Sequence, residues 1–264
     1  TKGFLKPVRK RPNLTVWTQA QALGITLRRG QDTPRHAMGV TVRRGAAGQA
    51  VQVTARAEVL LCDGAVASPQ LLQLSGIGNG ERLASVGITP QHELKGVGEN
   101  LQDHLQIRAV FGVSGLPRSG TLNTLANTWL GKTRIAMQYA LTQSGPMSMA
   151  PSQLGAFARS SPEREWPNLE YHVQPLSLDA FGEPLHPYPA FTASVCNLNP
   201  EARGSVHIRS PHADDAPKIA PNYLSTEADR RVAAESLRLT RRIAAQPALA
   251  AYAPKELKPG AQFE

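Results

Sequence analysis

The sequence has little cysteine, few aromatic residues and no long apolar run. Its 264 residues include two cysteines, Cys62 and Cys196, which excludes a disulfide-rich scaffold and a multi-cysteine zinc site. Aromatic residues make up 5% of the chain, and no stretch reaches the roughly 18 apolar residues of a membrane-spanning helix. No basic segment followed by an apolar core indicates an export signal. We therefore expect no transmembrane segment and a cytoplasmic location, with peripheral attachment to a membrane as the alternative.

Positive charge is in excess. Lysine and arginine number 29 against 20 acidic residues, and the formal net charge is +9. A basic protein can bind nucleic acid or an anionic membrane. The basic residues of this chain are scattered, however, and no aromatic residues interleave with their short clusters as they do on a single-strand binding surface. We expect no nucleic-acid partner.

The first part of the chain has the pattern of a β-meander followed by a helix. Stretches rich in β-branched residues and separated by turns predict strands over 13–20, 23–29, 38–44 and 51–62. The apolar run Val59–Cys62 is typical of a strand buried on both faces of a parallel sheet. Ser68, followed by Pro69, predicts the start of a helix that ends before Gly76. A second short helix is expected over 81–86.

The remainder mixes long helices with short strands. Apolar periodicity predicts helices over 122–141 and 226–245. Strands are expected over 169–176, 191–196 and 205–208. Composition and spacing alone thus predict an α+β protein with a twisted sheet.

Common catalytic and metal-binding patterns are missing. The glycines at 76, 78 and 80 follow a helix, so they indicate a helix end and a turn and not a phosphate-binding loop. No histidine pair has the spacing HExxH or HxH, so we expect no metal site. His104, next to Asp103, is the histidine that a neighbouring carboxylate could hold or charge. The sequence contains no GxSxG, which argues against a hydrolase triad.

One segment is much more specific. Residues 64–78, GAVASPQLLQLSGIG, resemble the second signature of the glucose–methanol–choline (GMC) oxidoreductases. Further segments resemble that family's landmarks: 11–16, 38–40, 96–104, 145–146, 203–206, 221–224 and 238–241. The resemblance extends over essentially the whole chain and is greatest to the choline-dehydrogenase-like branch.

The resemblance implies a two-domain flavoprotein fold of class α+β. Residues 1–104 would form part of an FAD-binding α/β domain with a β-meander, and residues 105–264 a substrate domain with an antiparallel sheet and flanking helices. The family's GxGxxG loop and its histidine segment, which reads like HPxGT, have no counterpart in these residues. We therefore expect an incomplete fold, the middle fragment of a longer enzyme.

The implied activity is oxidation of a CH–OH group by hydride transfer to FAD. Its partners would be a small-molecule alcohol and an electron acceptor, either oxygen or a quinone-type molecule. No catalytic residue is expected within this chain, so the isolated chain would be inactive. The alternative is a non-catalytic binding or structural module that keeps only the sheet of the substrate domain.

The resemblance also implies a few site residues. Ala22 matches the position whose backbone meets the adenine of FAD. Gly64 matches a glycine near the nucleotide, where the lack of a Cβ lets the backbone approach the cofactor. Tyr171, His172 and Gln174 are candidates for the substrate cavity. Side chains alternate along a strand, so Tyr171 and the pair His172 and Gln174 must face opposite sides, and only one set can line that cavity.

Overall fold

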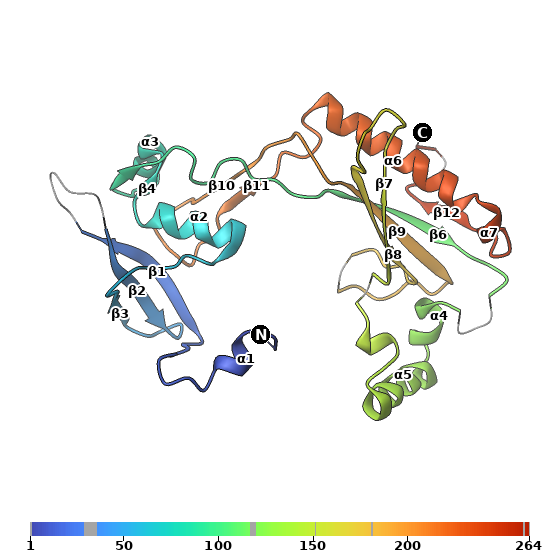
Figure 1. The fold of residues 1–264 in the computed structure, drawn as a ribbon, viewed down its shortest axis with the longest axis horizontal. Helices are drawn as coiled ribbons and strands as arrows, with labels where there is room; N and C mark the ends of the chain where they lie inside the picture. Colours follow the sequence, from blue (N-terminus) through green and yellow to red (C-terminus); the bar gives the residue numbers. More distant parts are fainter. Residues whose placement is uncertain are drawn as a thin grey trace. The chain divides into compact units, whose positions relative to one another are not determined.

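A computed structural model describes residues 2–28, 36–116, 120–150, 152–180, 182–260 and 262–263. The chain divides into two compact units, each of which is built from two segments (Figure 1). Unit 1 comprises Thr1–Leu101 and Arg203–Asn222, and unit 2 comprises Gln102–Ala202 and Tyr223–Glu264. The sequence predicted a single change of domain at residue 104, whereas residues 203–222 belong to unit 1.

Unit 1 contains a three-stranded antiparallel meander of β1 (Ala20–Leu27), β2 (Ala37–Arg44) and β3 (Ala50–Thr54). Helix α2 (Gly64–Leu74) packs on β1, where the Ser75 hydroxyl accepts a hydrogen bond from the backbone N–H of Ile25 at 2.7 Å. The smaller elements of unit 1 are α1 (Leu5–Val8), β4 (Ile77–Gly78), α3 (Gly80–Ser85), β5 (His92–Glu93), β10 (Ser205–His207) and β11 (Lys218–Ala220).

Three predictions for unit 1 were wrong in their boundaries. Residues 13–18 are irregular although they are rich in residues that favour β-strands. Such residues form a strand only where their side chains pack on a sheet, whereas Val16 and Trp17 are 45% and 40% exposed. Residues 59–62 form no strand, since no described strand pairs with them. Helix α2 begins at Gly64 and includes Pro69, and the Ser68 hydroxyl accepts a hydrogen bond from the N–H of Asp63 instead of capping the helix.

Unit 2 is built on a five-stranded antiparallel sheet with the strand order β12-β6-β9-β8-β7. The strands are β6 (Gln106–Gly112), β7 (Leu154–Ala158), β8 (Leu169–Gln174), β9 (Ala190–Asn197) and β12 (Lys255–Lys258). The helical elements are α4 (Leu122–Ala126), α5 (Trp129–Thr142), η1 (Pro146–Ser148), α6 (Glu227–Ala244) and α7 (Pro247–Ala250). The predicted α+β class is confirmed.

Helix α6 covers one face of this sheet and forms the core of unit 2 (Figure 1). Strand alternation places apolar side chains from β6, β9 and β8 on that face. They form two clusters with α6, which include Ala109, Phe111, Leu169, Tyr171, Ala193, Val195, Val232 and Ala244. The predicted helix 226–245 is confirmed within one residue at each end. Its start is set by Thr226, whose hydroxyl accepts a hydrogen bond from the N–H of Asp229 and so caps the helix.

The predicted helix over 122–141 is interrupted. Thr128 has an extended backbone, and its hydroxyl accepts a hydrogen bond from the N–H of Gly131 at 3.0 Å, so it begins a second helix, α5. The sequence pattern missed this break because apolar residues continue on both sides of it. Among the described residues, no helix is long and apolar enough to cross a membrane.

Candidate functional site

The face of the sheet opposite α6 carries many polar side chains, beside the buried apolar residues Val110 of β6 and Ala190 of β9. Because side chains alternate, the partners of the apolar set on β6, β9 and β8 point away from the helix. The residues among them other than Val110, Gly112 and Ala190 are Gln106, Arg108, Glu170, His172, Gln174, Thr192, Ser194 and Cys196. We call these residues the polar face. Polar side chains in the middle of a sheet cost free energy when they are buried without partners, so this face is the candidate site.

The strand register brings the members of the polar face into rows. His172 pairs with Ser194, Glu170 pairs with Cys196, and Gln174 pairs with Thr192. On the other side of β9, Arg108 pairs with Ser194 and Gln106 pairs with Cys196. Cross-strand partners on one face have Cβ atoms roughly 5 Å apart, so these side chains form one continuous surface.

Several of these polar side chains are buried. Thr192, Ser194 and Gln174 are 0%, 1% and 4% exposed. The amide nitrogen of Gln174 donates a hydrogen bond to the Ser152 hydroxyl at 3.2 Å, but its amide oxygen has no hydrogen-bond partner among the described residues. A buried acceptor without a donor costs about 1–3 kcal/mol, so this oxygen marks a position on the polar face where a donor is missing.

The polar face also carries charge. The Nε2 atom of His172 lies 3.5 Å from a carboxylate oxygen of Glu170, and both side chains are half-buried. Burial, together with the charge of Glu170, raises the pKa of the Cys196 thiol. The face therefore combines a carboxylate, an imidazole, an amide, hydroxyls and a protonated thiol.

The three predicted cavity residues are separated by the sheet. Tyr171 faces α6, where its hydroxyl lies 3.0 Å from the Thr240 hydroxyl and donates a hydrogen bond to the Ser236 carbonyl at 3.4 Å. Burial raises the pKa of Tyr171, so its hydroxyl is held as a neutral donor. His172 and Gln174 lie together on the polar face, which makes them the candidate pair.

The two predicted cofactor residues lie on adjacent elements of unit 1. Ala22 is a half-buried residue of β1 and pairs with Val42 of β2. Gly64 opens α2, the helix that packs on β1, and has a φ of +77° with no atom within 4 Å of the place where a Cβ would stand. The backbone at Gly64 is therefore open to close approach by a ligand, and its conformation favours glycine.

Replacing Gly64 by alanine is expected to destabilise unit 1 through backbone strain alone. A left-handed conformation costs a residue with a Cβ about 1–2 kcal/mol, and the space around this position is free. Gly96→Ala is the matched control, because Gly96 also has free space but no left-handed φ. Chemical denaturation should show a loss of about 1–2 kcal/mol for Gly64→Ala and none for Gly96→Ala. Equal stabilities of the two variants would contradict the strain.

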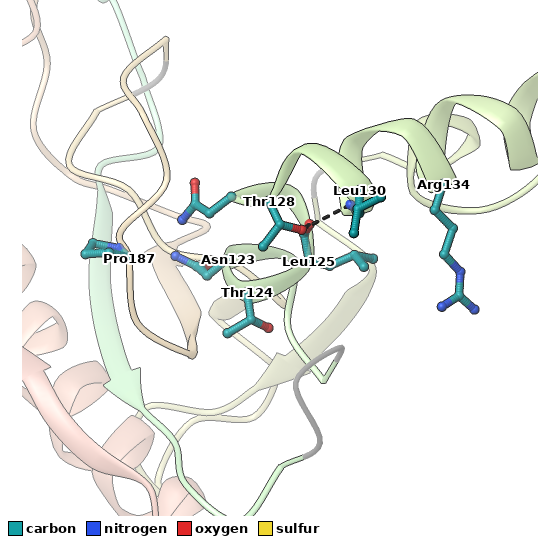
Figure 2. A pocket seen from close by; sticks show the side chains of 9 residues that line it. Asn123, Thr124, Leu125, Thr128, Leu130, Arg134 and Pro187 are labelled. Carbon is teal, nitrogen blue, oxygen red and sulfur yellow. Dashed lines mark hydrogen bonds between the residues drawn. The ribbon is translucent and has the colours of Figure 1, made fainter.

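A hollow of about 650 Å³ lies beside α4 and α5 (Figure 2). One of its lining residues, Asn123, is fully buried and donates hydrogen bonds to the backbone carbonyls of Ser177 and His186 at 3.0 and 2.8 Å. Its side-chain oxygen accepts from the N–H of Ser177 at 2.7 Å. Within the described part of the chain, no lining side chain of this hollow has a buried polar atom without a partner. The hollow is therefore a weaker candidate than the polar face.

Two models of the GMC oxidoreductase family match the chain. The N-terminal model matches residues 1–106, and the C-terminal model matches residues 200–264. Together they cover well over half of the chain. An oxygen-dependent choline dehydrogenase from Pseudomonas fluorescens (strain SBW25) is 36% identical over 259 residues, which is 98% of this chain and 44% of that protein.

Solved structures give the same result. The chain matches pyridoxine 4-oxidase from Mesorbium loti with 25% identity and a TM-score of 0.76, over 98% of this chain and 45% of that one. It also matches a formate oxidase with 20% identity and a TM-score of 0.83, over 96% of this chain and 47% of that one, which shows likeness of fold. The chain spans about half the length of the proteins it matches.

Proposed function

Because this chain belongs to the GMC oxidoreductase family, we propose that it forms part of an FAD-dependent enzyme that oxidises the CH–OH group of a small-molecule alcohol. In this proposal residues 1–104 contribute to the FAD-binding domain, and residues 105–264, apart from the segment 203–222 that belongs to unit 1, contribute most of the substrate domain. The observation that carries the proposal is the polar face of unit 2, with the unpartnered amide oxygen of Gln174 within it.

The residues of unit 1 fit a bound adenine nucleotide. Ala22 offers a small side chain on a half-buried strand, and Gly64 offers backbone with free space around it. Neither residue supplies charge for the pyrophosphate, which this family binds at a GxGxxG loop. When bound, the flavin supplies the hydride acceptor. In this proposal unit 1 forms one wall of the adenine site.

The part of unit 2 is to bind and orient the alcohol. The amide oxygen of Gln174 can accept a hydrogen bond from the substrate hydroxyl or from another polar group of the substrate. His172, which pairs with Ser194 across β9, places an imidazole on the same face. Fixing the reacting carbon in one orientation is itself a large part of catalysis. Choline is the first substrate to test, since the relative from Pseudomonas fluorescens is named for it.

The base that takes the alcohol proton lies outside these residues in this proposal. No described histidine stands in a segment like the family's HPxGT, and the chain contains no such segment. The isolated chain is thus proposed to be inactive. Reoxidation of the flavin would need an electron acceptor, either oxygen or a quinone-type molecule.

The alternative function is a binding module without chemistry. It is favoured by the lack of a pyrophosphate loop within these 264 residues. The two functions are distinguished by joining this chain to the GxGxxG and histidine segments of a GMC relative and assaying alcohol oxidation. Turnover supports the enzyme, whereas stable flavin binding without turnover supports the module.

In that extended polypeptide, Gln174→Leu is expected to raise the KM for the alcohol about tenfold. This is the effect of losing one hydrogen bond of about 1.4 kcal/mol to the substrate. Leucine has a similar size and removes both polar atoms of the amide, so the fold is expected to tolerate it.

Tyr171→Phe is the matched control, because it removes a hydroxyl from the opposite face of the same strand. It should lower the free energy of unfolding by about 1 kcal/mol and leave KM unchanged. If Gln174→Leu has wild-type kinetics, or if both variants raise KM equally, the polar face does not bind the substrate.

A further inference from the structure

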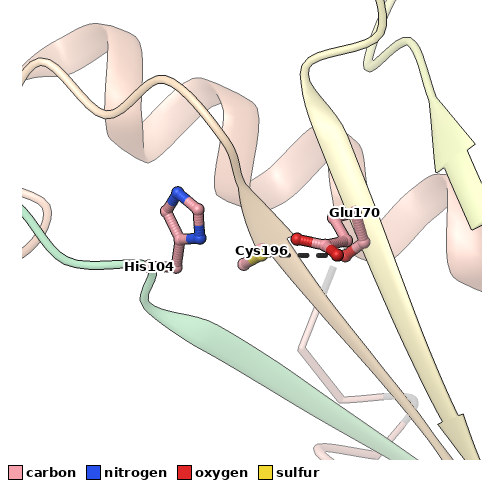
Figure 3. A group of neighbouring side chains, drawn as sticks. All are labelled: His104, Glu170 and Cys196. Carbon is pink, nitrogen blue, oxygen red and sulfur yellow. Dashed lines mark hydrogen bonds between the residues drawn. The ribbon is translucent and has the colours of Figure 1, made fainter. Parts of the chain in front are cut away.

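Three side chains of metal-ligand type meet at one end of the polar face. His104 precedes β6, Glu170 lies on β8 and Cys196 lies on β9. One ligand atom from each lies within 4.8 Å of the others. Figure 3 shows the ring of His104 and the side chain of Glu170 on either side of Cys196. All three residues belong to unit 2.

We propose that His104, Glu170 and Cys196 form a binding site for Zn²⁺ or a similar borderline-soft divalent transition-metal ion. Zinc binds thiolate, imidazole and carboxylate ligands, and sites with three protein ligands leave a fourth position for water. The mixed sulfur, nitrogen and oxygen set disfavours Ca²⁺ and Mg²⁺, which take oxygen ligands.

The hydrogen bonding of His104 suits a ligand. Its Nε2 atom lies 3.2 Å from the backbone carbonyl oxygen of Leu198. A carbonyl oxygen can only accept, so Nε2 carries the proton in this contact and Nδ1 keeps its lone pair. Histidines that bind metals usually donate their other ring N–H to a carbonyl or a carboxylate, which fixes the tautomer and the ring orientation.

Glu170 and Cys196 are held in place by the sheet. They are direct partners in the register of β8 and β9, and the Cys196 thiol donates a hydrogen bond to the backbone carbonyl of Glu170 at 3.8 Å. His172 lies 3.5 Å from the Glu170 carboxylate and can orient it from outside the ligand set. Metal–ligand distances are about 2.0–2.3 Å, so closing the site takes a small rotation of the exposed His104 and half-buried Glu170 side chains.

The environment of Cys196 also suits a metal. Its thiol is buried, and its sulfur lies within 4.8 Å of the ligand atoms of Glu170 and His104. A divalent cation attracts both the sulfur and the carboxylate, and coordination replaces the thiol proton, which is released to solvent.

From the sequence we expected no metal site. Spacing rules such as HExxH detect ligands that are neighbours in a helix or a loop. These three ligands come from a loop and two strands, and the register of β8 with β9 brings two of them together.

The test is a titration of the metal-free protein with Co²⁺, a spectroscopic substitute for Zn²⁺. We expect one equivalent to bind with thiolate-to-cobalt charge-transfer absorption, and Zn²⁺ to displace it. Cys196→Ser should abolish that absorption. His104→Ala and Glu170→Gln should each weaken binding at least about 100-fold, and His172→Ala about tenfold, as for an outer partner.

Cys62→Ser is the matched control, because it removes the other cysteine, which is exposed and in unit 1, and binding should not change. His104 is exposed, so the His104→Ala variant is expected to fold. It therefore still tests the site if the variant at the buried Cys196 fails to fold. A lack of saturable binding, or charge-transfer absorption that survives Cys196→Ser or disappears in Cys62→Ser, would overturn the proposal. The titration needs neither flavin nor alcohol, so its outcome is independent of the proposed enzyme activity.

Discussion

The 264-residue chain, purified by itself, is expected to hold no stoichiometric FAD and to oxidise no alcohol. The pyrophosphate of a dinucleotide is bound by glycine-loop amides and a helix N-terminus, and the chain contains no GxGxxG. Ala22 and Gly64 contribute contacts to the adenine alone in our proposal. The absorption spectrum should lack a flavin band, and assays with choline, glucose and aryl alcohols should show no turnover even with added FAD.

Two results would contradict this prediction. The first is a yellow protein with one flavin per chain after purification. The second is turnover that disappears when His104 or His172 is replaced, since it would place the base within these residues. A GMC relative of full length, assayed in parallel, is the positive control.

Asp229→Ala is expected to have the largest effect on stability. Asp229 is 5% exposed and lies in the first turn of α6. Its carboxylate accepts hydrogen bonds from the backbone N–H groups of Glu201 and Ala202 at 2.9 and 2.8 Å and from the Asn197 amide at 3.2 Å. Removing this acceptor from buried donors should lower the free energy of unfolding by about 3 kcal/mol.

The effect of Asp229→Ala should depend on pH. Burial alone would raise the pKa of Asp229, but the hydrogen bonds from Glu201, Ala202, Thr226 and Asn197 outweigh it and lower that pKa. A lowered folded-state pKa stabilises the protein above the unfolded-state pKa of about 3.9, and this stabilisation is lost as the pH falls through the folded-state value. The difference between wild type and variant should therefore be full at neutral pH and shrink in acid.

Glu227→Ala is the matched control, since Glu227 lies in the same helical turn but its side chain is 81% exposed. Its substitution should change the free energy of unfolding by less than about 0.5 kcal/mol. Denaturant titrations at neutral and acidic pH provide the comparison. Similar losses for the two variants, or a loss for Asp229→Ala that does not change with pH, would contradict the role given to Asp229.

Local sequence patterns predicted the elements whose signals are local. Helix α6 was predicted because its apolar residues recur at helical spacing. Residues 13–18 misled the prediction because their β propensity has no neighbouring strand to act on. Strands β6, β7 and β12 were missed, since their places in the sheet depend on pairing between distant segments.

The same limit applies to the candidate site. The alternation of side chains along a strand predicted that Tyr171 and the pair His172 and Gln174 face opposite sides of the sheet. Which of the two sides is covered by a helix depends on the packing of α6 against Tyr171, and the sequence does not show this. The buried amide oxygen of Gln174 has no signal in the sequence, because its burial depends on residues far along the chain. The grouping of His104, Glu170 and Cys196 depends on strand register, which a single sequence does not specify.

The most direct test of the proposed function is anaerobic reduction of the flavin. The extended polypeptide, with the GxGxxG and histidine segments of a GMC relative joined to this chain, is loaded with FAD and mixed with choline or another primary alcohol without oxygen. We predict that the absorption band of oxidised flavin is lost as the alcohol carbon transfers hydride. Bound flavin that stays oxidised with every alcohol, although a chemical reductant bleaches it, would contradict an alcohol oxidoreductase and support a binding module.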